Sequence, residues 1–277
     1  IPGTGSSGHL CGGMLLSAIL GPEAGFLTMI GVLLIQCLMF GDGGIMALGC
    51  NIWNMAFYGC FIGAMVVWRL IMKNGMNKKK ITFAAILGCI VTLQLGAFSV
   101  SLETLASGIT ELPFSVFVAT MQPIHLAIGL VEGLITSAVL CFVYEARPEL
   151  LWNYRDNKMV TEKKAKMSYR GTIVALAAMA IVIGGLVSLV ASSNPDGLEW
   201  SIEKLTGSTD VAASGKIYDA AASLQNFTAI LPDYGFKGSD SVLGTSFSGI
   251  IGCIVVVALC VVICYAIKFF KRKRNNE

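Results

Sequence analysis

Charged residues are scarce in this 277-residue chain: Asp, Glu, Lys and Arg together make up 13% of it. An ordinary soluble domain carries about 25%. Hydrophobic residues account for 55% of the chain. This composition excludes a soluble enzyme, a disordered tail and a disulfide scaffold. It indicates an all-α polytopic membrane protein, with room for about six or seven spanning helices.

Motifs for nucleotide hydrolysis and for a cysteine-based metal site are also missing. The sequence contains no GxxxxGK[ST] motif, so the chain does not hydrolyse nucleotide itself, and active transport would need an ion gradient or a partner. It contains no CxxC pair, and its nine cysteines all lie in apolar runs, where thiols behave as small hydrophobic groups. No nucleic-acid partner is expected, and the apolar runs predict a lipid environment.

The apolar runs predict a helical bundle of six full spans and one shorter helix. A span needs about twenty residues, whereas Leu10–Leu20 reaches only about 16 Å before Gly21-Pro22-Glu23 and is predicted to be a half-span. Phe114–Met121, before Pro123, is predicted to be a partial or interfacial helix that leads into the next span. The predicted full spans are Ala24–Phe40, Ile45–Met72, Ile81–Ala106, Ile124–Tyr144, Gly171–Ala191 and Gly249–Phe270.

The distribution of Lys and Arg predicts the orientation. Sixteen of the 20 basic residues lie in loops 73–80 and 147–170 and in the tail from 268. Cytoplasmic segments carry such an excess, so the C-terminus is predicted to be cytoplasmic. Segments 41–44, 107–123 and 193–245 then face outside, and the last of these carries seven acidic residues and three lysines.

Five polar residues in or beside the apolar runs are candidates for function. His9 follows the turn GTGSSG, and imidazole is a frequent transition-metal ligand. His125 and Glu132 are seven residues apart and share one helix face, and an intramembrane carboxylate is costly enough to suggest a function. Alternatively, the Glu132 carboxylate forms a hydrogen bond to a Ser, Thr or Asn of a neighbouring helix and holds the bundle together. Asn51 and Asn54 also share a face and either orient a metal ligand or join helices.

Pairs of glycines four residues apart predict where helices approach one another closely. Gly59/Gly63 and Gly129/Gly133 are two such pairs within predicted spans. The first pair is also a candidate contact face for a partner protein.

Several motifs together resemble one known family. The strings IPGTGSSGHLCGGMLLSAILGPEAGFLTM, FGDGGIMALGCNIWNMAF and PIHLAIGLVEGLIT are similar to the CbiM/NikM family, the substrate-binding membrane components of energy-coupling factor (ECF) transporters for cobalt and nickel. This resemblance covers residues 1–192. The segment NPDGLEWSIEKL, with LPDYGF and a final span, resembles the PDGLE-type domain, which is similar in role to the small CbiN/NikN partner. A second domain is therefore predicted over 193–277, with an extracytoplasmic loop 193–245, the last span 249–270 and a basic cytoplasmic tail.

The resemblance implies a metal importer in the prokaryotic plasma membrane, not an enzyme. Such a component binds Co²⁺ or Ni²⁺ from outside, holds no permanent cofactor, and works with an ECF transmembrane coupling protein and ABC-type ATPases. Family ligands are the N-terminal amine, the backbone nitrogen and imidazole of a second-position His, and a His in a GxSGH-like turn. Only the last maps here, onto His9, so the other ligands are expected in a preceding N-terminal segment. Carboxylates at irregular spacing suit hard cations, so loop 193–245 is expected to help load the site rather than supply its ligands.

Two alternative functions are open at this point. Gly5-Ser6-Ser7-Gly8 fits the GxSG pattern of rhomboid intramembrane proteases, with Ser7 as nucleophile and His125 as base. The second alternative is a proton-coupled secondary transporter that uses Glu132 as its proton relay.

Overall fold

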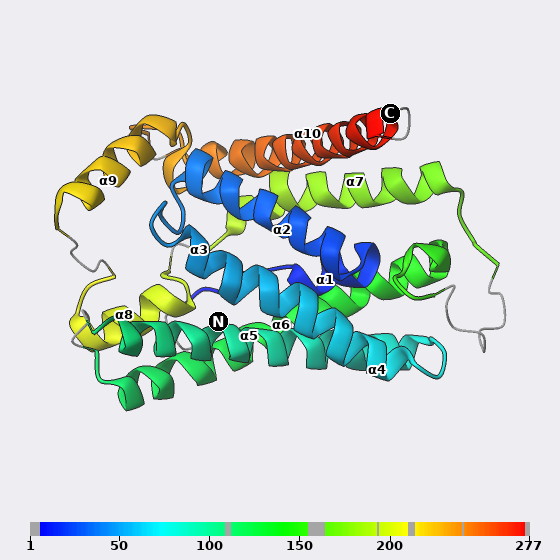
Figure 1. Cartoon of the computed structure of the whole chain (residues 1–277), viewed down its shortest axis with the longest axis horizontal. Coiled ribbons are helices and arrows are strands. Elements are labelled where there is room, and N and C mark those ends of the chain that lie inside the picture. Colours follow the sequence, from blue (N-terminus) through cyan, green and yellow to red (C-terminus); the bar gives the residue numbers. More distant parts are fainter. Residues whose placement is uncertain are drawn as a thin grey trace. The chain divides into compact units, whose positions relative to one another are not determined.

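The computed structural model describes residues 6–108, 112–154, 164–192, 194–209, 214–239 and 241–274. Within these ranges the chain forms helices and no strand (Figure 1). The α-helices are α1 Gly13–Leu20, α2 Pro22–Ile35, α3 Leu48–Asn51, α4 Arg69–Met72, α5 Lys78–Ser107, α6 Phe114–Ala146, α7 Tyr169–Gly185, α8 Gly197–Thr206, α9 Lys216–Thr228 and α10 Leu243–Arg274. Two segments are π-helical, η1 Gln36–Phe40 and η2 Ile52–Trp68, and three are 3₁₀ turns, η3 Pro148–Leu150, η4 Val187–Val190 and η5 Pro232–Tyr234.

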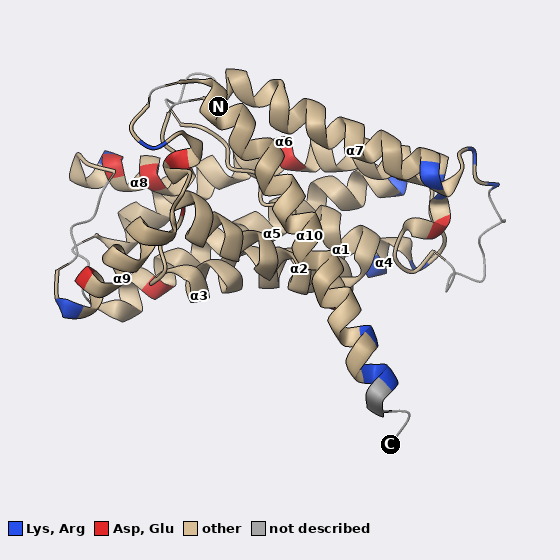
Figure 2. Ribbon diagram, turned by 90° about the horizontal axis from the view of Figure 1, so that it is seen from above, with Lys and Arg blue, Asp and Glu red and all other residues tan. Residues whose placement is uncertain are grey.

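Six helical stretches of the described chain are long and apolar enough to cross a membrane, which confirms the predicted number of full spans. Charged side chains are sparse along the long helices and gather at helix ends and in connecting segments (Figure 2). The chain is therefore a multi-pass membrane protein. The stretches are Pro22–Phe40, Leu48–Met72, Lys78–Ser107, Phe114–Ala146, Tyr169–Val190 and Leu243–Arg272.

The prediction of a partial helix before Pro123 is wrong. Phe114–Met121 and the following span form one helix, α6, with Pro123 inside it. Membrane helices tolerate such a proline when neighbouring groups compensate for the lost backbone hydrogen bond. The neighbouring helix α5 holds this stretch of α6 in place: Gln94 and Gln122 each donate from the side chain to the other's backbone carbonyl, at 2.7 and 3.2 Å, and Phe117 and Met121 are buried against Ala97 of α5. Tertiary packing therefore carries the helix through the proline.

The chain divides into two compact units, which are described separately. Unit 1 comprises residues 1–29, 49–173 and 192–214, and unit 2 comprises residues 30–48, 174–191 and 215–277. The predicted domain boundary at 192/193 remains a proposal.

Glycines set the helix spacing in unit 1. Helices α5 and α6 lie side by side (Figure 1), and a Cβ atom at Gly133 would come within 2.5 Å of the Ile86 Cα atom. A Cβ at Gly129 would come within 3.0 Å of the Ile90 Cα atom, so the close approach predicted at this glycine pair is confirmed.

The Gly59/Gly63 pair lies inside unit 1, which makes it wrong as a partner face. A Cβ at Gly59 would come within 3.0 Å of the Gly13 Cα atom in α1. At Gly63 it would come within 2.9 Å of the Met14 sulfur atom. The short helix α1 therefore packs directly on η2: the two backbones touch at Gly13 and Gly59, and Gly63 leaves room for the Met14 side chain.

Two basic loops of unit 1 meet at the same end of the α5–α6 pair. The Lys78 ammonium lies 3.3 Å from the Glu145 carboxylate, which also pairs with Lys166. The Tyr144 hydroxyl donates to the Met76 carbonyl at 3.0 Å. Segments 73–80 and 164–168 therefore share one end of unit 1, as the positive-inside prediction requires of two loops on one side of the membrane.

Unit 2 contains α7 from Val174 onward, helices α9 and α10, and the turn after η1. Gly184 of α7 and Gly249 of α10 are in backbone contact, since a Cβ at Gly249 would approach the Gly184 carbonyl oxygen to 2.4 Å. Ser246 donates its hydroxyl to the Gly185 carbonyl. These two spans are thereby joined at the glycines.

A polar cluster fixes the GDGG turn (41–44) within unit 2. Gln36 donates to the Asp42 carboxylate at 3.2 Å and to the Tyr234 hydroxyl at 3.1 Å, and Tyr234 donates to Asp42. Burial, together with the nearby Asp42 charge, raises the pKa of Tyr234, so it remains a neutral donor at neutral pH. Gln225 of α9 adds hydrogen bonds to the Ile45 amide and the Gly41 carbonyl. The LPDYGF segment therefore docks on the GDGG turn.

Candidate functional site

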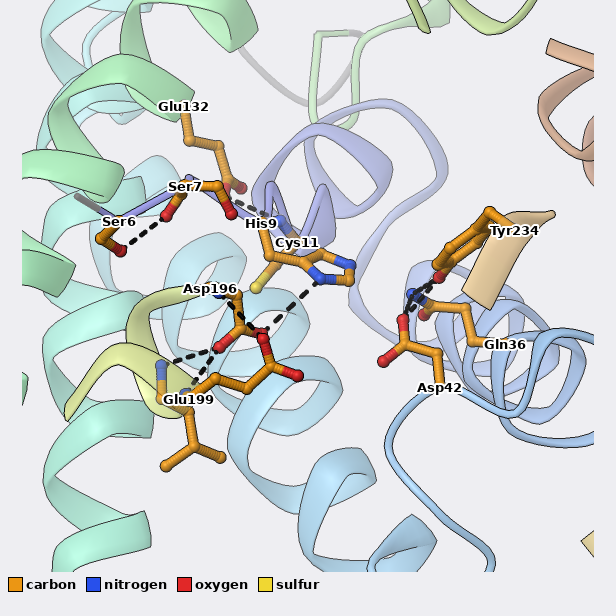
Figure 3. A network of polar contacts seen from close by, with 11 residues as sticks. Ser6, Ser7, His9, Cys11, Gln36, Asp42, Glu132, Asp196, Glu199 and Tyr234 are labelled. Carbon is orange, nitrogen blue, oxygen red and sulfur yellow. Dashed lines mark hydrogen bonds and ion pairs between the residues drawn. The ribbon is translucent and has the colours of Figure 1, made fainter. Parts of the chain in front are cut away.

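His9 lies in an irregular segment that leads into α1, within unit 1. Its side chain is 37% exposed, and its Nδ1 atom lies 3.9 Å from the Asp196 Oδ2 atom (Figure 3). Asp196 directly precedes α8. The imidazole ring is partly open to solvent, and a histidine in such a position can bind a transition metal.

Glu132 of α6 anchors the segment that carries His9 (Figure 3). Its Oε2 atom accepts the Cys11 amide proton at 2.9 Å, and its Oε1 atom accepts the Gly12 amide proton at 3.0 Å. The Cys89 thiol lies 3.8 Å from Oε1, and the Glu132 side chain is only 3% exposed. Hydrogen bonds to a charged group contribute about 1.5–3 kcal/mol each. The buried carboxylate therefore binds backbone amides, rather than the neighbouring hydroxyl or amide side chain that the sequence suggested.

These two hydrogen bonds also explain where α1 begins. The predicted half-span started at Leu10, whereas the helix starts at Gly13, after Gly12 with φ of 78°. Only glycine adopts this left-handed conformation at little cost. Helix α1 is about 12 Å long and ends at Leu20, with Gly21 as its C-cap, so the half-span prediction holds with a later start.

The PDGLE-like segment lies directly beside His9. The Ser7 amide donates to the Pro195 carbonyl at 2.7 Å, and Asp196 caps α8. Helix α8 is amphipathic and turns three apolar side chains toward a buried cluster of α5 and α6. These side chains are Leu198, Ile202 and Leu205, and the cluster consists of Ala97, Phe117 and Met121.

His125 and Glu132 share α6 but contact different parts of the chain. The His125 Nδ1–H group donates to the Met121 carbonyl at 2.8 Å. A Cβ at Gly197 would come within 3.0 Å of the His125 Cε1 atom, so α8 begins against this ring. Among the contacts of the described residues, no hydrogen bond joins His125 to the Ser7 hydroxyl. The protease alternative therefore lacks its catalytic pair in this structure.

Asn51 and Asn54 differ in burial. Asn51 is the last residue of α3 and is half-buried, whereas Asn54 is buried in η2. The Asn54 side-chain amide donates to the Glu103 carboxylate of α5 at 2.9 Å. The change from α- to π-helix between them alters the number of residues per turn. Their role in orienting a metal ligand stays a prediction.

Within the described ranges, no three His, Cys, Asp or Glu side chains are grouped to hold a metal ion. The structure brings together His9, Asp196 and, through the backbone, Glu132. Sequence reasoning missed Asp196 as a neighbour of His9. The only local signal was its position at the start of a predicted helix, which indicates a cap rather than a site.

Two family profiles match the chain. The profile described as "Cobalt uptake substrate-specific transmembrane region" matches residues 1–150, and the profile described as "PDGLE domain" matches residues 170–269. No solved structure gives a significant match.

Relatives that match nearly the whole chain are fused proteins. The putative fused nickel transport protein NikMN of Archaeoglobus fulgidus is 34% identical over 264 residues, covering 94% of this chain and 77% of the relative. The probable fused nickel transport protein LarMN of Lactiplantibacillus plantarum is 28% identical over 273 residues, with the same coverage of 94% and 77%. The cobalt transport protein CbiM of Sorangium cellulosum is 29% identical over 152 residues, covering 54% of this chain and 67% of the relative.

These matches confirm the resemblance that the GDGG and PDGLE motifs indicated. The matched relatives are transport proteins. The chain belongs to the family of cobalt uptake substrate-specific transmembrane proteins and carries a PDGLE domain after the region that matches this family.

Proposed function

We propose that this protein is the substrate-specific component of an ATP-driven ECF importer, and that it captures Co²⁺ or Ni²⁺ from outside at His9. The family match and the relatives named as nickel and cobalt transport proteins support the metal class. The observation that carries the site is the fixed position of the His9 segment, which two backbone amides bind to the buried Glu132 carboxylate.

The position of His9 within unit 1 supports capture from outside. Helix α8, whose first turn adjoins His9, packs on the N-terminal half of α6 and the C-terminal half of α5. The basic segments 73–80 and 164–168 lie at the opposite ends of these two helices. If the basic end faces the cytoplasm, the imidazole is on the outer half of the bundle.

We expect metal uptake to depend on partner proteins, because the sequence contains no nucleotide-binding motif. Cells that express this protein with an ECF coupling protein and its ATPases should accumulate radiolabelled nickel or cobalt. Cells that carry an ATPase with a defective Walker A lysine should not. Normal uptake in cells without any ECF ATPase would contradict the proposal. If that uptake also collapsed with a protonophore, the result would favour the proton-coupled alternative at Glu132.

The orientation is tested by labelling single cysteines in a cysteine-free variant. Ser208→Cys, after α8, should react with a membrane-impermeant maleimide added to intact cells. Lys164→Cys, in the basic segment before α7, should react only after the cells are opened. Both side chains are exposed, so access to solvent does not itself separate them. The reverse labelling pattern would invert the proposed topology.

A further inference from the structure

We propose that Asp196 is a positioning residue for His9: its carboxylate accepts the Nδ1 proton and leaves the Nε2 lone pair directed to the metal. This inference rests on the proposed binding of Co²⁺ or Ni²⁺ at His9. It gives the first turn of the PDGLE domain a chemical role at the site without making it a metal ligand.

The two oxygens of Asp196 have separate tasks. Oδ1 accepts the backbone amide protons of Leu198 and Glu199 at 2.9 and 3.0 Å, which caps α8. The Glu199 carboxylate in turn accepts the Asp196 amide proton at 3.1 Å. This reciprocal capping box fixes the Asp196 side chain. It leaves Oδ2 facing the imidazole of His9 (Figure 3).

Contacts on both sides keep the His9 and Asp196 segments together. The Ser7 amide bonds to the Pro195 carbonyl, which joins the two backbones directly before the two functional side chains. Beyond them, Cys11 and Trp200 pack against one buried cluster of α5 and α6, formed by Leu93, Ile124 and Ile128. The approach of Asp196 to His9 is therefore set by packing and backbone bonds, and not only by attraction between the two side chains.

The chemistry of imidazole explains why a carboxylate is useful here. Neutral imidazole carries one proton, so a metal bound at Nε2 requires that proton on Nδ1. A carboxylate acceptor beside Nδ1 selects this tautomer, and loss of such a partner typically costs about 10–100-fold in metal affinity. The 3.9 Å separation exceeds direct hydrogen-bond length. A small rotation of the half-exposed imidazole, or one bridging water, completes the contact.

The substitution Asp196→Asn tests this role with little change in structure. Asparagine caps helices as well as aspartate does, and its carbonyl oxygen can replace Oδ1. Its NH₂ group replaces Oδ2 and donates instead of accepting, which favours the tautomer with a bare Nδ1 and a protonated Nε2. We expect NMR of the metal-free, full-length protein, grown with isotope-labelled histidine, to show this tautomer change at His9. Nickel affinity measured by calorimetry should fall by about tenfold or more.

Glu203→Gln is the matched control. It removes the same charge from the same helix at an exposed position, outside the capping box at Asp196. We expect it to leave the His9 tautomer unchanged and nickel affinity within about twofold of wild type, since an exposed charge contributes little. If both variants lost nickel affinity equally, the cause would be the loss of one negative charge, and the proposal would be overturned. So would an Asp196→Asn variant with wild-type ring signals. If the wild-type protein binds neither nickel nor cobalt, the proposed function fails, while the ring signals of the metal-free protein still decide the role of Asp196.

Discussion

Replacing His9 by alanine should remove high-affinity binding of nickel and cobalt to the full-length protein. The change deletes an imidazole nitrogen that we propose as a direct ligand. Affinity should fall by more than the roughly 10–100-fold that outer-shell changes cost. Calorimetric titration of the purified, detergent-solubilised protein with each metal measures this loss.

The fold should survive that substitution, because the His9 side chain is 37% exposed and lies outside the helices. A thermal unfolding curve close to wild type is the expected control result. His125→Ala removes the only other histidine of the sequence and should leave metal affinity within a few-fold. Loss of binding in the His125 variant, together with normal binding in the His9 variant, would reverse the assignment of these two residues.

Glu132→Gln should lower both stability and metal affinity. The carboxylate accepts one backbone proton at each oxygen, whereas a glutamine amide has one oxygen and places its NH₂ group against the second amide. A buried donor without a partner costs about 1–3 kcal/mol. The midpoint of thermal unfolding should therefore fall by several degrees. The loosened His9 segment should bind nickel at least about tenfold more weakly, which corresponds to about 1.4 kcal/mol.

Glu145→Gln provides the control for Glu132 on the same helix. Glu145 pairs with Lys78 and Lys166 near the surface, and such ion pairs contribute about 0–1 kcal/mol. This variant should bind metal as wild type does. If Glu132→Gln also bound metal normally and unfolded at the wild-type temperature, the carboxylate would not be the anchor of the His9 segment.

The sequence was sufficient for those features that depend on local composition. Span number follows from run length and hydropathy, and the half-span at α1 follows from the early break at Gly21-Pro22. Pro123 misled the prediction because helix continuity there depends on Gln94 and on burial of neighbouring side chains, which are contacts between different helices.

Contacts at the candidate site were less predictable. The high cost of an intramembrane carboxylate identified Glu132 as important, but its partners are the amides of Cys11 and Gly12. The first amides of any helix lack partners within it, but nothing in the sequence showed that a carboxylate of a distant helix would accept these two. The pairing of His9 with Asp196 joins residues 187 positions apart in the chain, and no periodicity or spacing rule connects them.

The Glu132 contact also changes the electrostatic character of the start of α1. A helix N-terminus with free amides carries a partial positive charge and ordinarily attracts anions. At α1 the two amides before the helix already point at a buried carboxylate of the protein itself. These two amides are therefore occupied and not available to an outside anion, so this helix start does not act as the anion site that its geometry would otherwise provide beside His9.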